Sequence, residues 1–173
     1  MNIAKERRAI EAALDSYREQ LDSFTGEAFA ATPSIGGWSL SEVYDHILKA
    51  SLSSSIALER CTHNNCPPTK KGMNLWGYYV MLTGRFPFSK VKMPESVAAK
   101  MAPRKIEIEE AKNLLIKVRK RVESTAALVP DAPASARWEH PRLGMLNAAQ
   151  WFRFIRVHLQ HHLKQLERIK ASM

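Results

Sequence analysis

Four long segments of the chain repeat apolar residues every three or four positions, and no segment of any length alternates with a period of two. The first periodicity is typical of amphipathic helices, and the second would indicate strands. The four segments cover residues 2–24, 39–61, 103–128 and 147–169. The sequence therefore predicts an all-α fold, a four-helix bundle whose apolar stripes face a common core.

Helix boundaries are marked by capping signals. Ser39 followed by Glu42 forms a capping box at the start of the second segment, and Asn147 followed by Gln150 repeats that pattern at the start of the fourth. Pro130 closes the third segment, because proline disfavours helical geometry in the residue before it. These signals predict where three of the helix ends lie.

About forty residues separate the second and third helices, far more than a tight antiparallel turn requires. Such a crossover can run the length of a bundle and leave the two helices parallel. It contains "NLWGYYVML", which predicts a short extra helix, and a proline-rich stretch over residues 87–103. With 173 residues, the chain suits a single well-cored domain over residues 1–173.

The net charge of +9 lies in the second half of the chain. Residues 1–86 carry nine Lys/Arg and nine Asp/Glu, whereas residues 87–173 carry seventeen and eight. A basic segment of this kind can contact nucleic acid or an acidic partner, or its charges can simply lie on solvated helix faces. Its densest run, "KVRKRVE", lacks the interleaved aromatic residues of a single-strand binder. Nucleic acid is therefore a less favoured partner, although the pattern leaves it open.

The N-terminal segment is charged from its fifth residue and lacks the apolar run of a signal peptide, and no stretch approaches the length of a membrane span. We therefore expect a cytoplasmic protein with no membrane partner. In that compartment Cys61 and Cys66 should be reduced thiols. They flank the motif "CTHNNC", whose spacing matches no standard zinc site.

Histidines interrupt the apolar stripe of the fourth helix. His158 and His162 are four residues apart, so their rings share one face of the helix. His46, on the second helix, would reach a similar depth if the two helices run antiparallel. Spacing alone leaves two interpretations open: three separate core histidines, or a three-histidine metal site. Three protein ligands with an open fourth position are typical of catalytic metal sites.

Two motifs carry a family resemblance, "GWSLSEVYDHI" and "HPRLGMLNAAQWFRFIRVHLQHHLKQL". Together they resemble the DinB/YfiT-like superfamily of metal-dependent enzymes. The resemblance implies a bundle in up-down-down-up order, commonly a homodimer, with His46, His158 and His162 binding zinc or nickel. Members include thiol-dependent S-transferases and a mycothiol-dependent isomerase, so a low-molecular-weight thiol is a second expected cofactor.

These observations predict a metal-dependent enzyme of the thiol S-transferase or hydrolase type that acts on a small molecule. The alternative is a non-catalytic binding or stress protein that uses the basic surface. Gln165 and His161 are the candidate catalytic residues: Gln165 points the same way as His162, and His161 lies about 80° off the centre of that face. Asp45 is expected to face solvent.

Overall fold

The computed structural model describes residues 1–34, 36–86 and 102–173. Its long helices are α1 (Ile3–Ser23), α3 (Leu40–Thr62), α6 (Ile108–Ala126) and α7 (Ala148–Lys170). Two shorter helices, α2 (Gly26–Ala30) and α4 (Leu75–Thr83), and two strands, β1 (Arg137–His140) and β2 (Gly144–Asn147), complete the described elements. The predicted extra helix in the crossover is α4, and most of the proline-rich stretch lies outside the described residues.

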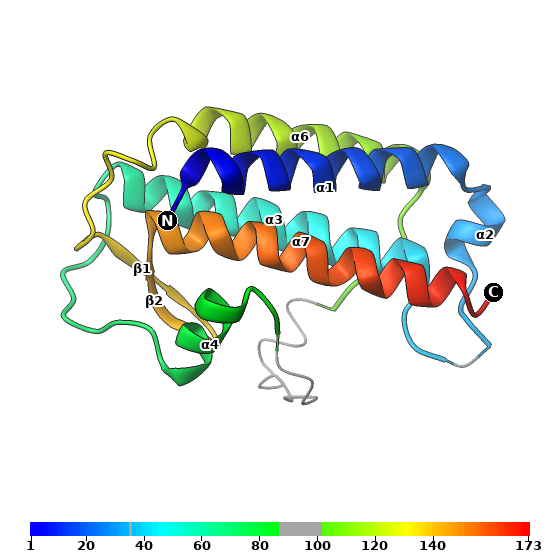
Figure 1. Ribbon diagram of the computed structural model, residues 1–173. Coiled ribbons are helices and arrows are strands. Elements are labelled where there is room, and N and C mark those ends of the chain that lie inside the picture. The colour runs from blue at the N-terminus through cyan, green and yellow to red at the C-terminus, as the bar shows by residue number, and fades with distance from the viewer. Residues whose placement is uncertain (35, 87–101) are drawn as a thin grey trace.

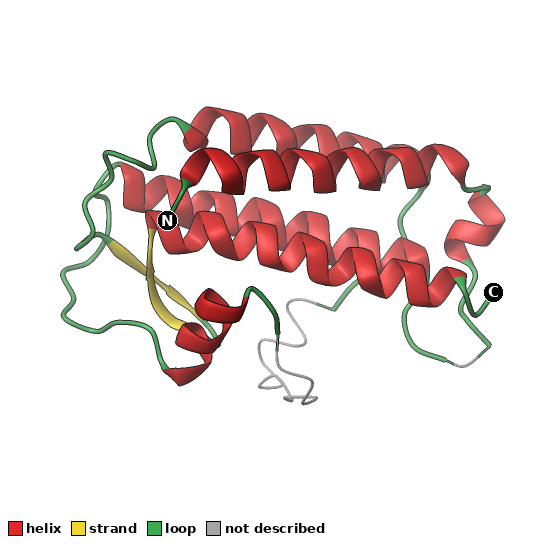
Figure 2. Cartoon of the chain, viewed as in Figure 1, coloured by secondary structure: helices red, strands yellow, loops and turns green. Residues whose placement is uncertain are grey.

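The four long helices pack as two layers, with α1 and α6 side by side over α3 and α7 (Figure 1). Helices α1 and α7 run in one direction, and α3 and α6 run in the other. In chain order the bundle is therefore up-down-down-up, with α4 and the small sheet at one end (Figure 2). The predicted four-helix bundle is confirmed.

Local capping determines where α3 and α7 begin. In α3 the Ser39 side chain accepts from the backbone N–H of Glu42, whose carboxylate accepts from Ser39 in return. Asn147 and Gln150 form the same reciprocal pair at the start of α7. Each box satisfies backbone donors that a helix start leaves without partners. Both predicted capping boxes are present.

The apolar stripes of the helices meet in one core. None of the helices in the described part of the chain combines the length and the apolarity that a membrane crossing requires. The largest fully buried side chains come from α1, α2, α3, α7 and β2: Tyr17, Tyr44, Phe29, Phe152, Ile10, Leu14, Leu21, Leu40, Ile47, Leu48, Leu58 and Leu146.

Two buried tyrosines form hydrogen bonds across this core. The Tyr17 hydroxyl donates to the carbonyl of Leu159 on α7, and the Tyr44 hydroxyl donates to the carbonyl of Tyr17, each at 2.9 Å. Burial raises the pKa of both phenols, so they remain protonated donors. The two bonds tie α1 to α7 and α3 to α1.

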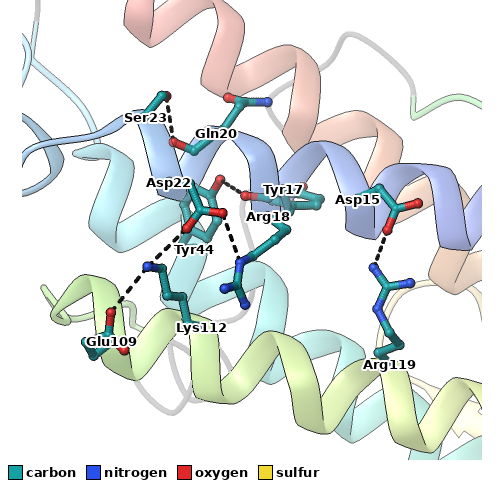
Figure 3. A network of polar contacts seen from close by, with 10 residues as sticks. All are labelled: Asp15, Tyr17, Arg18, Gln20, Asp22, Ser23, Tyr44, Glu109, Lys112 and Arg119. Atoms are coloured by element: carbon teal, nitrogen blue, oxygen red, sulfur yellow. Dashed lines mark hydrogen bonds and ion pairs between the residues drawn. The ribbon is translucent and has the colours of Figure 1, made fainter.

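Ion pairs join α1 to α6 on the outside of the bundle (Figure 3). Lys112 lies 3.0 Å from Asp22 and 3.3 Å from Glu109, and Arg119 pairs with Asp15. Because the carboxylates of these pairs are exposed to solvent, each pair contributes little to stability. Their effect is to set the register of the antiparallel helices α1 and α6.

The ion pair between α1 and α7 is different, because its carboxylate is buried. Glu6 is 6% exposed and accepts from Arg153 at 2.9 Å and from Arg156 through its other oxygen. Arg156 also donates to Gln160 at 2.6 Å. One carboxylate therefore binds two guanidinium groups where the starts of the parallel helices α1 and α7 meet.

The third long helix begins at Ile108, five residues later than the sequence predicts. Residues 102–107 form no helix, and α3 binds them from the side through Ser41 and Asp45. The Ser41 hydroxyl lies 2.6 Å from both the backbone nitrogen and the carbonyl of Ile106. Because Ser41 of α3 already forms hydrogen bonds with these two backbone groups, an earlier start of the helix would add no hydrogen bond for them.

The sequence also missed the hairpin formed by β1 and β2. Its antiparallel register runs from Arg137 opposite Asn147 to His140 opposite Gly144. Strands of four residues are too short to display an alternating pattern. The Met145 N–H donates to the carbonyl of Gly72 at 3.1 Å, so the hairpin also holds the segment that leads into α4.

We expect Gly144→Ala to destabilise the protein by about 2 kcal/mol or more. Gly144 has φ +80°, and a Cβ there would lie 2.8 Å from the Gly72 carbonyl oxygen and 2.9 Å from the Asn74 nitrogen. Urea unfolding would measure the change. The control is Gly26→Ala, whose Cβ meets nothing within 4 Å and which should be neutral or slightly stabilising. Equal losses in both variants would contradict this account.

Candidate metal centre

Three imidazoles converge between α3 and α7. His46 comes from α3, and His158 and His162 come from α7. Their possible ligand atoms all lie within 4.8 Å of one another. The Nε2 atoms of His158 and His162 are 3.1 Å apart, and the His46 ring centroid is 4.9 Å from that of His162. The structure thus brings together the three histidines that the sequence singled out.

The fold explains this convergence. Residues four apart on α7 lie one above the other on the same face, which places His158 and His162 side by side. Helix α3 packs antiparallel against that face, so His46, near the start of α3, meets residues in the second half of α7. Neither helix alone could assemble the set.

Gln165 fixes the orientation of one ring. Its Oε1 atom lies 2.8 Å from Nδ1 of His162. Because an amide oxygen only accepts, Nδ1 of His162 carries the proton and Nε2 keeps a free lone pair directed at His158. Histidines that bind metals commonly donate their other ring N–H in this way.

The three imidazoles are neutral at physiological pH. Burial, followed by repulsion from His46, lowers the pKa of His162 to about 3. Burial followed by repulsion from His162 lowers the pKa of His158 well below its ordinary value, and burial lowers that of His46. Neutral imidazole is the form that binds a metal, so these residues suit a divalent transition ion.

The spacing of the donors also fits a metal ion. Tetrahedral zinc with ligands at 2.0–2.1 Å needs donor nitrogens about 3.3 Å apart. The separation of the His158 and His162 Nε2 atoms is already close to this value. In addition, Nδ1 of His158 is buried and has no hydrogen-bond partner among the described atoms. The other nitrogen of this ring, Nε2, is the one that lies close to His162.

Comparisons with known proteins identify the family of the chain. The family model described as the DinB superfamily matches residues 9–166. The chain belongs to the DinB superfamily. No curated protein matches the sequence.

Solved structures share the fold at low sequence identity. A four-helix bundle protein, TT2238, is 19% identical with a TM-score of 0.63, over 96% of this chain and 99% of that one. YfiT from Bacillus subtilis is 13% identical with a TM-score of 0.62, over 98% of this chain and 86% of that one. YfiT is described as a probable metal-dependent hydrolase with an unusual four-helix bundle topology.

Aromatic rings line the histidines of this DinB-superfamily protein. The Trp38 ring lies 5.0 Å from His46, and the Phe154 ring lies 5.2 Å from His158. Phe86, which follows α4, also packs near this ring, at 5.7 Å from His158. The sequence interpretation did not include either phenylalanine. Phe154 is four residues before His158, so helical spacing could have identified it, whereas Phe86 carries no such signal.

His161 lies at the edge of this DinB site. Its side chain is exposed, and its ring centroid is 5.0 Å from both His162 and Phe86. Burial, Arg168 and Lys164 lower its pKa. It does not belong to the converging set, in agreement with its predicted position off the centre of that face.

The expectation that Asp45 faces solvent was wrong. Asp45 is 1% exposed, pairs with Lys49 at 2.6 Å and accepts from the backbone N–H of Arg104 at 3.0 Å. It therefore holds the returning crossover against α3, beside His46. Its partner Arg104 lies 59 residues further along the chain, which explains why helical periodicity gave no sign of the contact.

The remaining histidines stay outside the site. Nδ1 of His140 accepts the backbone N–H groups of Arg142 and Leu143 at 3.1 and 3.2 Å, which closes the hairpin turn. Burial lowers the pKa of His140 to about 4. His63 of the "CTHNNC" motif is exposed, and among the described residues it joins no convergent ligand group with the two cysteines.

Proposed function

We propose that this DinB-superfamily protein is a metal-dependent enzyme that acts on a small molecule at the His46, His158 and His162 site. The observation that carries the proposal is the convergence of three neutral imidazoles between α3 and α7, with donor atoms within 4.8 Å. The description of YfiT supports a hydrolase. The resemblance to thiol-dependent S-transferases supports a transfer reaction from a low-molecular-weight thiol. Zinc and nickel are the proposed metals, and a homodimer remains the expected assembly.

The contacts of each residue at the proposed site suggest its role. The three histidines would hold a divalent ion, which lowers the pKa of a water or thiol bound to it and so supplies a nucleophile at neutral pH. Gln165 keeps the His162 ring in its ligating tautomer. Phe86 and Phe154 limit water and offer apolar contacts to a substrate. At the exposed edge, His161 would accept or deliver a proton.

The basic surface gives weaker support to a nucleic-acid function. Within the run "KVRKRVE", Arg119 pairs with Asp15 of α1, and Arg121 pairs with Glu59 of α3 at 2.8 Å. These two charges are therefore partly used in holding helices together. A phosphate backbone would have to compete with carboxylates that already occupy the guanidinium groups.

Elemental analysis of protein purified without an affinity tag or chelator tests the proposal. We expect about one transition-metal ion per chain, or uptake of one zinc or nickel ion by the apo protein. Assays with activated esters and amides, and with thiols plus electrophiles, would then separate the hydrolase from the transferase. A protein that neither contains nor takes up an ion would overturn the proposal.

Gln165→Ala should weaken zinc binding by about 10- to 100-fold, because the His162 ring loses the acceptor that fixes its tautomer. Competition with a chromophoric chelator would measure the affinity. Gln160→Ala is a suitable control, since Gln160 lies on the same helix but contacts Arg156 rather than a histidine. An unchanged affinity in Gln165→Ala would show that the contact does not support the ligand.

A further inference from the structure

The two cysteines lie together at the end of α3, outside the site described above. Cys61 is buried and Cys66 is half-buried, and their Sγ atoms are 3.7 Å apart. The Cys66 thiol donates to the Cys61 sulfur, and the Cys61 thiol donates to the carbonyl of Leu146 at 3.7 Å. The two sulfurs are therefore in van der Waals contact in the folded protein.

A turn at the helix end produces this contact. Asn64 has φ +52°, the left-handed conformation that commonly ends helices and is tolerated by asparagine. The N–H of His63 bonds to the Glu59 carbonyl at 3.0 Å, and the N–H of Asn65 bonds to the Arg60 carbonyl at 2.8 Å. The chain thus folds back over the last turn of α3, which returns Cys66 to Cys61.

We propose that Cys61 and Cys66 are a peroxide-sensitive pair that forms a reversible disulfide within one chain. A disulfide requires its sulfurs about 2.05 Å apart. The observed separation is 3.7 Å, so closure asks for a shift of less than about 2 Å. Because Cys66 lies in a loop rather than in a helix, it can make that movement.

The two thiols have different roles in the proposed oxidation. Cys66 is the more accessible, so it meets peroxide first: its sulfur takes one oxygen to become a sulfenic acid, and one water leaves. The Cys61 sulfur then attacks the Cys66 sulfur, and the departing hydroxide takes the Cys61 proton as a second water. The two thiols lose two electrons and two protons in total, and peroxide is reduced to two waters.

The environment of Cys61 suits the second role rather than the first. Burial, followed by its contact with Cys66, raises the pKa of the Cys61 thiol to about 12, so it does not react with peroxide in solution. Its attack on Cys66 is intramolecular, and proximity compensates for its low reactivity. The pair is also remote from the metal site, since Cys61 follows His46 by 15 residues (61 − 46), or about 22 Å along α3.

Treatment of the reduced full-length protein with hydrogen peroxide tests the proposal. Intact mass and thiol counting should show the loss of two hydrogen atoms and both thiols, in a chain that remains single on a non-reducing gel. Dithiothreitol should restore both thiols. Cys66 oxidised to a sulfinic acid beside an unmodified Cys61, or a disulfide between two chains, would overturn the proposal.

Three variants sharpen the test. In Cys61→Ser, the Cys66 sulfenic acid should persist and react with dimedone, whereas in Cys66→Ser the Cys61 thiol should remain unmodified. Asn64→Val should slow disulfide formation by about tenfold, because a β-branched residue disfavours positive φ, and Asn65→Val should not. Oxidation of Cys61 in Cys66→Ser at the wild-type rate, or equal rates in both asparagine variants, would contradict the assigned roles. Zinc uptake should be unchanged in both cysteine variants, which separates this pair from the proposed enzyme.

Discussion

Replacing His162 by alanine should reduce bound metal from about one ion per chain to background while the helix content stays nearly unchanged. His162 makes a polar contact through each of its ring nitrogens, with His158 at 3.1 Å and with Gln165 at 2.8 Å. Two imidazoles remain in the variant, and two ligands are too few for tight binding. We expect a stability loss of about 1–3 kcal/mol in the apo protein, from a small cavity and an unpaired Gln165.

His161→Ala is the matched control for this experiment. His161 is the preceding residue on the same helix, yet it is exposed and does not belong to the converging group of donors. Metal content should therefore be close to that of the parent protein. Metal analysis and circular dichroism would be run on all three proteins. Unfolding of His162→Ala would show that the ion holds the bundle together, and loss of metal from His161→Ala alone would show that the ligands are wrongly assigned.

Glu6→Ala should lower the free energy of unfolding by about 3 kcal/mol. The Glu6 carboxylate is buried between Arg153 and Arg156, whose side chains are only 25% and 14% exposed. Removing it leaves two guanidinium groups close together, poorly solvated and without a counter-charge. Breaking a buried ion pair from one side costs far more than the pair itself contributes.

Glu11→Ala provides the comparison on the same helix. Glu11 pairs with Arg7 across one turn, and the two side chains are 32% and 47% exposed. Its loss should cost less than about 0.5 kcal/mol. Urea unfolding of both variants would give the two free energies. If Glu6→Ala proves as mild as Glu11→Ala, water already solvates the two arginines in the folded protein.

The features that the sequence predicted well are those encoded by residues close together in the chain. The starts of α3 and α7 follow from Ser39 with Glu42 and from Asn147 with Gln150, pairs that lie three residues apart. Likewise, the four-residue spacing of His158 and His162 places their rings on one face without any tertiary information. His46 became a candidate only on the assumption that the second and fourth helices run antiparallel, because nothing local connects it to α7, and the family resemblance then favoured it as a ligand.

The features that the sequence missed depend on partners far along the chain. Asp45 carries the helical pattern of an exposed residue until its bond to the backbone of Arg104 is known. The late start of α6 has the same origin, since the Ser41 hydroxyl satisfies Ile106, 65 residues away. Phe86 reaches the site only because α4 packs against α7. Periodicity describes a helix face, and it does not identify what covers that face.

The division of the three histidines between α3 and α7 sets the order in which the proposed enzyme is made. Helix α7 leaves the ribosome after the other three bundle helices, so a nascent chain that has just completed α6 contains only His46 of the set. A single imidazole cannot retain an ion against the competing ligands of the cell. In the proposed enzyme, the ion would therefore bind only after α7 has been made, beside the aromatic side chains that line the histidines. The identity of the proposed metal would then depend on which ions are available once α7 has been made.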